Sequence, residues 1–266
     1  MKALSHLTPE RFRRMVPVFD GVMSLGDYIK VRSRPAMKPG VVNVAGIPTV
    51  YSDKTGLLHS VREIFLEEVY KFESKSNSPR IIDAGSNIGL SIRYFKSLYP
   101  EATIVGYEPD EIIFKMLAEN VGKMRGVVIH QAAAWVENTN LVFYKEGSLA
   151  GSSEVDFSGT GNSVEVIAVS LKDEIDKAPV DFLKIDIEGA ENSVLFDIES
   201  SLDNVENLFF EYHSSPDKPQ ILGDMLGMVS AKGFRYTING AHGARLPFVE
   251  KVTRGFDLQL NVFCYR

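Results

Sequence analysis

The segment Arg80–Leu90 constrains the fold of this chain more than any other segment. It reads Arg-Ile-Ile-Asp-Ala-Gly-Ser-Asn-Ile-Gly-Leu, which is an apolar strand that stops at an acid, a turn of small residues and the start of a helix. In such a unit, backbone N–H groups and a helix N-terminus face a bound ligand. Glycine permits close backbone approach because it has no Cβ atom. The segment therefore predicts an α/β domain with a ligand-binding turn.

The glycine spacing limits which ligand this turn can hold. The spacing is Asp-x-Gly-x-Asn-x-Gly, from Asp83 to Gly89. A dinucleotide fingerprint would need Gly at position 87 and Gly or Ala at position 90, where the chain has Asn87 and Leu90. The spacing therefore argues against an NAD-dependent oxidoreductase or a sugar-nucleotide epimerase, and no Tyr-x-x-x-Lys pair lies in a suitable place for either.

Strand and helix patterns alternate from residue 80 onward. Strands are predicted over Arg80–Asp83, Thr103–Tyr107, Val127–Gln131, Leu141–Tyr144, Val164–Val169, Val180–Ile187, Val205–Tyr212, Phe234–Ile238 and Leu258–Phe263. Helices are predicted over Ile88–Leu98, Asp110–Val121, Ala190–Ile198 and Gln220–Ala231. Asp110 is a plausible N-cap of its helix. The alternation predicts a doubly wound, mostly parallel sheet with helices on both faces.

Two segments are expected to lie outside this pattern. Residues 1–79 form an N-terminal extension, a lid or a dimer arm, and residues 80–266 form the catalytic domain. The extension is expected to contain short helices, a hairpin and an amphipathic helix, over Leu4–Ile29, Val41–Tyr51 and Leu58–Phe72. The Gly/Ser-rich segment Glu146–Asn162 is long for a structureless connection. We interpret it as a substrate lid in preference to a plain flexible loop.

Composition and charge exclude several classes of protein. The chain has 266 residues, of which 44% are hydrophobic, and its net charge of −6 gives no overall basic surface for nucleic acid. The sole cysteine, Cys264, cannot form an intrachain disulfide, which suits a reducing compartment. Residues 1–20 do not resemble a signal peptide, and no apolar run approaches the roughly 20 residues of a membrane span. We therefore expect a cytoplasmic protein.

The ends of the second and third predicted strands also fit a nucleoside. Glu108, followed by Pro109, lies 23 residues after Gly85. An acid at about this separation accepts hydrogen bonds from both ribose hydroxyls; the alternative is an acid that only caps the next helix. After the third strand, Ala133 lies within the small-residue run Ala132–Ala134. This run would leave room for a flat adenine ring, and simple close packing explains it equally well.

A second group of ionisable residues lies along the strand predicted over Val180–Ile187. Side chains alternate along a strand, so Lys184, Asp186 and Glu188 share one face. A central parallel strand is covered on both faces, where unpaired charges are costly to bury. The group is tolerable if Lys184 pairs with an acid and both acids emerge at the carboxyl end of the strand. The pattern favours a functional cleft over a structural ion-pair network.

The next predicted strand places Glu211 and His213 on one face near its carboxyl end. A histidine titrates near neutral pH and can act as a general base. The alternative is a histidine that orders the loop that follows it. Asp186, Glu211 and His213 could also bind a divalent metal, because carboxylate and imidazole are common ligands. No tight ligand spacing supports a metal, so the sequence does not favour one.

These motifs together resemble the FkbM-type methyltransferases, a family of class I S-adenosylmethionine-dependent methyltransferases. The matching segments are Asp83–Gly89, Tyr107–Asp110, Val166–Leu171, Lys184–Glu191 and Glu211–His213. The pattern Lys-x-Asp-x-Glu-Gly-x-Glu follows the glycine turn at the right distance, which makes the resemblance specific. It covers roughly residues 80–213, whereas the N-terminal segment and the C-terminal third match no pattern that we can name.

The resemblance implies a seven-stranded sheet with an antiparallel last strand, and methyl transfer from S-adenosylmethionine to a hydroxyl of a saccharide or another small molecule. The implied cofactor contacts are Asp83, Gly85, Ser86, Asn87, Gly89, Glu108, Pro109 and Ala133. The implied catalytic residues are Asp186, Glu188, Glu211 and His213, with His213 or a carboxylate of Asp186 or Glu211 as the base. A catalytically inactive, cofactor-binding partner subunit is the alternative, and the ionisable strand faces argue against it.

Overall fold

The structure is a computed structural model that describes residues 21–145, 151–152, 163–250, 252–253 and 255–266. The chain divides into two compact units, one that ends at Lys71 and one from Phe72 to Arg266, and each is described by itself. Within the described ranges, no helix has both the length and the apolar character needed to cross a membrane. Residues 1–20 and most of the predicted lid Glu146–Asn162 lie outside the described residues.

The first unit contains a hairpin and short helices. Strands β1 (Gly40–Val44) and β2 (Ile47–Tyr51) pair antiparallel, which confirms the predicted hairpin. The helical segments are α2 (Leu25–Ser33), α3 (Lys54–Val61) and the π-helical turn η2 (Arg62–Leu66). The helix predicted over Leu58–Phe72 has the wrong bounds. It begins earlier because the Asp53 side chain caps it, and it ends before Glu68, whose φ is 52°.

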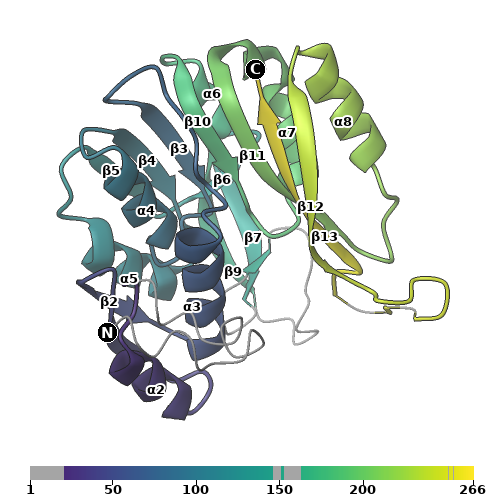
Figure 1. The fold of residues 1–266 in the computed structure, drawn as a ribbon. Coiled ribbons are helices and arrows are strands. Elements are labelled where there is room, and N and C mark those ends of the chain that lie inside the picture. The colour runs from purple at the N-terminus through teal and green to yellow at the C-terminus, as the bar shows by residue number, and fades with distance from the viewer. Residues whose placement is uncertain (1–20, 146–150, 153–162, 251, 254) are drawn as a thin grey trace, which may run out of the picture. The chain divides into compact units, whose positions relative to one another are not determined.

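The second unit is built on a seven-stranded sheet with the strand order β12-β13-β11-β10-β3-β4-β5 (Figure 1). The parallel strands are β3 (Arg80–Ala84), β4 (Thr103–Tyr107), β5 (Val127–His130), β10 (Val180–Ile185) and β11 (Val205–Ser214). Strand β13 (Leu258–Tyr265) runs antiparallel to both β11 and β12 (Arg235–Gly243). This topology confirms the predicted α/β sheet and its antiparallel last strand.

Helices cover both faces of this sheet (Figure 1). One face packs against α6 (Leu171–Ile175), α7 (Glu191–Asp197), the 3-10 helix η3 (Ile198–Asn204) and α8 (Leu222–Ala231). Leu183 and Ile185 of β10 lie in that apolar core. On the other face, Phe95 of α4 (Leu90–Leu98) packs on Phe182 of β10 with ring centroids 5.2 Å apart. Helix α5 (Glu111–Val121) begins after its predicted N-cap, Asp110.

A separate four-stranded sheet has the order β6-β9-β7-β8. Its strands are β6 (Ala133–Trp135), β7 (Thr139–Lys145), β8 (Gly151–Ser152) and β9 (Ser163–Ser170). The predicted strands Leu141–Tyr144 and Val164–Val169 fall within β7 and β9, which pair antiparallel. Strands β7 and β9 therefore belong to the smaller sheet and do not extend the seven-stranded sheet.

The β3–α4 turn packs closely against the end of β10 at Gly85, and a substitution there tests this packing. Its φ is 87°, and a Cβ atom there would overlap the carbonyl oxygen of Asp186. We expect Gly85→Ala to lower the free energy of unfolding by at least about 2 kcal/mol, because the left-handed backbone and the overlap both carry a cost. Urea unfolding measures the change.

Gly223→Ala in α8 is the matched control. A Cβ atom at Gly223 meets nothing within 4 Å outside its own helix, and its φ is not positive. Alanine favours a helix over glycine, so this variant should be neutral or more stable by up to about 1 kcal/mol. Equal stabilities of the two alanine variants would contradict the packing argument for Gly85.

Candidate active site

The β3–α4 turn is anchored to the end of the neighbouring strand β4. The N–H groups of Gly85 and Ser86 both donate to the carbonyl oxygen of Tyr107, at 3.1 and 2.8 Å. Asn87 has a φ of 47°, and its Oδ1 accepts a hydrogen bond from the N–H of Ile88 at 2.7 Å. The turn is therefore held in one conformation at the carboxyl ends of β3 and β4.

Gly89 serves the packing of two helices as well as the turn. Its φ is 88°, and it is the N-cap residue of α4. A Cβ atom there would lie 2.8 Å from side-chain atoms of both Leu117 and Val121 in α5. The two turn glycines, Gly85 and Gly89, are thus required by close approach of protein segments.

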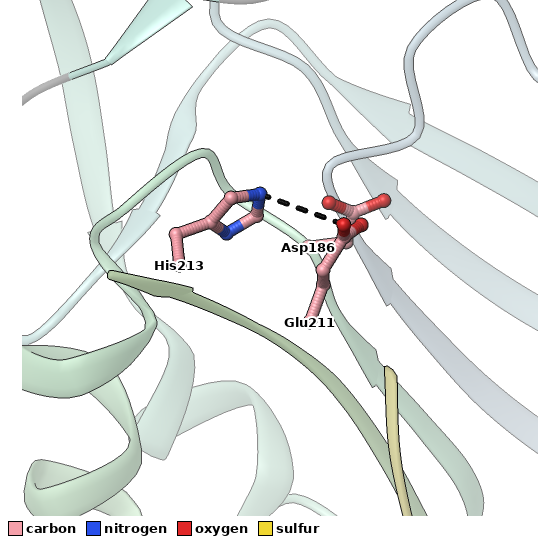
Figure 2. Close-up of side chains that lie close together, drawn as sticks. All are labelled: Asp186, Glu211 and His213. Carbon is pink, nitrogen blue, oxygen red and sulfur yellow. Dashed lines mark ion pairs between the residues drawn. The ribbon is translucent and has the colours of Figure 1, made fainter. Parts of the chain in front are cut away.

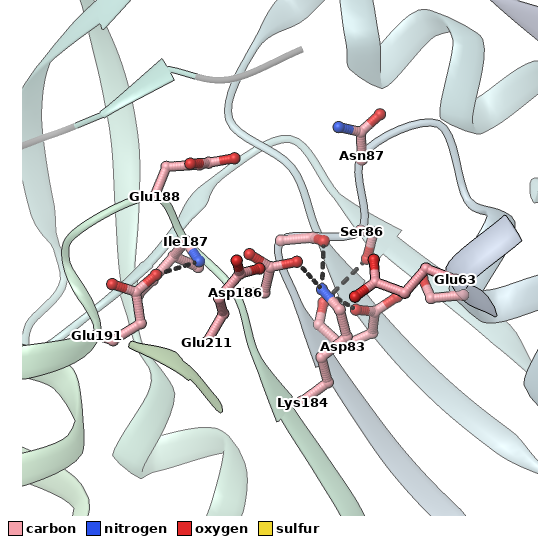
Figure 3. Close-up of polar contacts among 12 residues, drawn as sticks. Glu63, Asp83, Ser86, Asn87, Lys184, Asp186, Ile187, Glu188, Glu191 and Glu211 are labelled. Atoms are coloured by element: carbon pink, nitrogen blue, oxygen red, sulfur yellow. Dashed lines mark hydrogen bonds and ion pairs between the residues drawn. The ribbon is translucent and has the colours of Figure 1, made fainter. Parts of the chain in front are cut away.

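Lys184 joins the end of β3 to the end of β10 (Figure 3). Its Nζ lies 3.3 Å from Asp83 Oδ1 and 3.2 Å from Asp186 Oδ2, and it donates to the carbonyl oxygen of Gly85 at 2.8 Å. Burial lowers the pKa of Lys184, but the carboxylates of Asp186 and Asp83 outweigh it and hold the pKa above its ordinary value. Asp83 is fully buried and also accepts from the Ser91 hydroxyl at 2.6 Å, so its carboxylate lies beneath the turn.

Glu108 lies directly behind the turn, as the sequence spacing predicts. Its Oε2 accepts from the N–H of Asn87 at 3.0 Å, and its Oε1 accepts from the N–H of Asp110 at 2.9 Å. Asp110 itself caps α5, so Glu108 is not the helix cap. Burial raises the pKa of Glu108 to about 8, although both N–H donors and the nearby Lys184 oppose this rise. Pro109 connects these two acids.

Ala133 begins β6 and pairs with Ala168 of β9 in the smaller sheet. It is buried, and its neighbours Ala132 and Ala134 belong to the apolar core of the second unit. Ala132 and Ala134 are therefore closely packed, as the alternative to an adenine-binding role would require. The structure gives Ala133 no polar contact with the glycine turn.

Asp186, Glu211 and His213 come together at the carboxyl ends of β10 and β11 (Figure 2). Ile185 pairs with Phe210, so the residues that follow each of them lie side by side. Glu211 and His213 lie two residues apart on β11 and point to the same side. One carboxylate oxygen from each acid and one ring nitrogen of His213 all lie within 4.8 Å of one another.

His213 is surrounded by carboxylates. Its Nδ1 lies 3.2 Å from Glu191 Oε1, and its Nε2 lies 3.5 Å from Glu188 Oε2 and 3.7 Å from Glu211 Oε1. Burial lowers the pKa of His213, but the three carboxylates outweigh it and raise the pKa to about 10. The ring therefore holds a proton at neutral pH when no other cation is bound. Burial raises the pKa of Asp186, but Lys184 and His213 lower it below the ordinary value.

Glu191 is a structural residue of the site, and the sequence pattern that contains it did not predict its role. Its Oε1 accepts from the N–H of Ile187 at 2.8 Å and its Oε2 accepts from the N–H of Gly189 at 2.9 Å. Strand β10 ends at Ile185, so the predicted strand over Val180–Ile187 is too long. The chain turns because Glu188 and Gly189 have φ of 56° and 98°, and Glu188 reaches His213 from this turn. In the sequence, an acid at the first position of a helix that follows a strand is the signal for a side chain that accepts from nearby backbone N–H groups.

The site therefore has two halves that meet where β3 lies next to β10. One half is formed by the glycine turn and by the Glu108 carboxyl group behind it. The other half is formed by the carboxylates and the imidazole at the ends of β10 and β11. Ligands of open α/β sheets bind at this position, outside the carboxyl ends of the strands.

Residues 83–236, more than half of the chain, match the family model described as the methyltransferase FkbM domain, and both halves of the site fall within that range. A match of this extent defines the class of the protein, which is an S-adenosylmethionine-dependent methyltransferase. Within that class, the chain belongs to the FkbM methyltransferase family.

Relatives with curated descriptions are also methyltransferases. Methyltransferase sdnD of Sordaria araneosa is 29% identical over 69% of this chain and 84% of its own length. Hexuronic acid methyltransferase AglP of Haloferax volcanii is 22% identical over 75% of this chain and 85% of its own length. 2-O-methyltransferase NoeI of Sinorhizobium fredii is 26% identical over 50% and 63%, so this chain spans less than two thirds of NoeI.

Among solved structures, the chain is similar to methyltransferase FkbM from Methylobacillus flagellatus, with a TM-score of 0.46 and 18% identity. That similarity covers 73% of this chain and 45% of the other chain, so the present chain spans less than half of its length.

Glu108 should give the stability of the protein a measurable pH dependence. Its folded pKa of about 8 lies above the unfolded value of about 4.3, so between these pH values the folded state keeps a proton that the unfolded state has lost. The free energy of unfolding should therefore fall as pH rises through this window, by on the order of 1.4 kcal/mol per pH unit.

Glu108→Gln cannot titrate and should lack this component. Urea unfolding of both proteins between pH 5 and pH 8 measures the difference, and Glu119→Gln on the exposed surface of α5 is the control. The same pH dependence in wild type and Glu108→Gln would show that Glu108 is ionised throughout the window.

Proposed function

We propose that this enzyme transfers a methyl group from S-adenosylmethionine to a hydroxyl oxygen of a saccharide or another small molecule. One observation carries the proposal: Asp186, Glu211 and His213 converge beside a glycine turn that Glu108 backs. Lys184 links the two halves, because it contacts both Asp186 and the carbonyl oxygen of Gly85. Groups that can take a proton therefore lie next to the proposed cofactor site.

The residues of the turn fit the nucleoside part of the cofactor. Each oxygen of the Glu108 carboxyl group accepts one backbone N–H and keeps a lone pair for a ribose hydroxyl. Gly85, Ser86, Asn87 and Gly89 form the turn that would line the methionine and ribose side. Pro109 and Ala133 are the proposed neighbours of the adenine side. When bound, S-adenosylmethionine supplies an electrophilic methyl group on a sulfonium sulfur.

The second half of the site removes the proton from the acceptor. An aliphatic hydroxyl must lose its proton as its oxygen is methylated, and a positioned base assists this step. His213 is a poor base at neutral pH while it holds its own proton. We therefore assign proton removal to the carboxylates of Asp186 and Glu211. The protonated ring of His213 compensates their negative charge, and Glu188 pairs with the same ring nitrogen and helps to fix its position.

The acceptor class is supported by what the relatives are named for. AglP is a hexuronic acid methyltransferase, and NoeI is a 2-O-methyltransferase. A saccharide hydroxyl is therefore the acceptor that we propose to test before others.

Glu108→Gln should weaken binding of S-adenosylhomocysteine by about 2- to 10-fold, because the amide replaces one carboxyl oxygen with an NH₂ group that cannot accept, and an ordinary hydrogen bond contributes about 0.5–1.5 kcal/mol. Isothermal titration calorimetry measures the affinity, with Glu119→Gln as the control that should bind as the wild type does. NAD should give no heat of binding. Tight binding of NAD, or unchanged affinity in Glu108→Gln, would contradict the cofactor assignment.

Asp186→Asn and Glu211→Gln should keep binding of S-adenosylhomocysteine but lower turnover by about 10²- to 10⁴-fold, the usual contribution of a general base. Transfer of radiolabelled methyl to uronic acid and neutral glycosides measures turnover. Glu206→Gln is the matched control, because Glu206 also lies on β11 but has a side chain that is 45% exposed and pairs with Lys75. Full activity in both site variants would refute the proton-removal role. Cofactor binding without transfer to any acceptor would favour the inactive partner subunit.

A further inference from the structure

We propose that Asp186, Glu211 and His213 bind a hard divalent cation, Mg²⁺ or Mn²⁺, at the carboxyl ends of β10 and β11. This inference deepens the proposed function, because a role of the cation in the reaction rests on that function. The sequence alone did not favour a metal, because these residues show no close ligand spacing. The structure supplies what the spacing lacks, since pairing of two parallel strands brings the three side chains together.

The geometry suits a small octahedral cation. Ligands bound at 2.0–2.1 Å lie roughly 3 Å apart when adjacent and about 4 Å apart when opposite. The three donor atoms of Asp186, Glu211 and His213 lie within 4.8 Å of one another, so small side-chain rotations bring them to these separations. Figure 2 shows the side chains pointing toward a common point from β11 and the end of β10. Three coordination positions are left for water or acceptor oxygens.

The surroundings of His213 are those of a metal-binding imidazole. A ligating histidine usually faces a carboxylate or carbonyl with its other ring nitrogen, which fixes the ring orientation. Here Nδ1 faces Glu191 at 3.2 Å, and Nε2 is directed toward Glu188 and Glu211. The side chain is 1% exposed, and its Nδ1 makes no hydrogen bond of normal geometry. Glu191 is itself fixed by two backbone N–H groups.

Several carboxylates surround the cluster, and Figure 3 shows those of Glu188, Glu191 and Glu211 near Asp186. Lys184 compensates Asp83 and Asp186, and three further carboxylates face His213, those of Glu188, Glu191 and Glu211. A divalent cation held by Asp186, Glu211 and His213 would lie among these carboxylates, which attract it electrostatically.

The donor set selects the kind of cation. Two carboxylate oxygens and one imidazole nitrogen form a hard, oxygen-rich site without thiolate. Carboxylate and water ligands suit Mg²⁺ and Mn²⁺, whereas tetrahedral sulfur and nitrogen sets suit Zn²⁺.

Binding of Mn²⁺ tests the proposal without reference to catalysis. Full-length protein is freed of metal with a chelator and titrated with MnCl₂, and electron paramagnetic resonance measures the free aquo ion. We expect one saturable site in the wild type. Asp186→Asn and Glu211→Gln should each weaken it by at least about 10-fold, and Glu191→Gln, which removes the carboxylate behind His213, by about 10- to 100-fold.

Two matched controls should bind Mn²⁺ as the wild type does. Glu206→Gln removes a half-buried carboxylate from the opposite end of β11, and His59→Gln removes an imidazole that is 72% exposed. Circular dichroism and S-adenosylhomocysteine binding show that each variant is folded. Absence of a saturable site in the wild type would overturn the proposal. Saturable binding that Asp186→Asn and Glu211→Gln leave unchanged would overturn it as well, because the ion would then lie elsewhere.

The cation and the methyl transfer can fail separately. If methyl transfer persists unchanged in excess chelator, the cation has no part in the reaction, and the proposed function stands. If Mn²⁺ binds at one site that depends on Asp186 and Glu211 but no acceptor is methylated, the cation site stands and the proposed function fails. A requirement for Mg²⁺ or Mn²⁺ in transfer, together with site-dependent binding, supports both.

Discussion

The buried ammonium group of Lys184 is the interaction on which the site depends. It is 3% exposed and contacts Asp83 at the end of β3, Asp186 after β10 and the carbonyl oxygen of Gly85. A buried pair that loses one partner leaves an uncompensated charge, which typically costs about 3–5 kcal/mol. Lys184 therefore does more than neutralise two acids. It fixes the distance between the turn that is proposed to hold the cofactor and the strand end that carries the reacting groups.

The strand order explains why two half-sites can share one edge of the sheet. Chain order runs from β3 outward to β4 and β5 on one side, and later from β10 to β11 on the other side. The half-site formed by Gly85 and Glu108 comes from the first branch, and the half-site formed by Asp186, Glu211 and His213 comes from the second. They meet because β3 pairs with β10, which is the point where the order reverses. Residues about 100 positions apart, such as Gly85 and Lys184, thus become neighbours.

Local patterns were sufficient for most elements, and they failed where the chain departs from regular backbone. The period of apolar residues predicted the strands, and the chemistry of Asp110 predicted the start of α5. Periodicity could not show that β10 ends at Ile185. The strand ends because the chain turns at Glu188, which has a left-handed backbone, and Glu191 accepts hydrogen bonds from the N–H groups on either side of that residue. Periodicity also could not show the register of β10 against β11. The composition of the acidic cluster was therefore predictable, but its distances were not.

The chemistry of His213 depends on its neighbours in the fold, which the sequence does not show. A histidine at a strand end suggests a base with a pKa near neutrality. Three carboxylates at 3.2–3.7 Å change that expectation, because they favour a positive charge on or beside the ring. That charge is a proton in one state and the proposed divalent cation in the other. In both states it lies next to Asp186 and Glu211, where it offsets the negative charge that develops on an acceptor oxygen as its proton leaves.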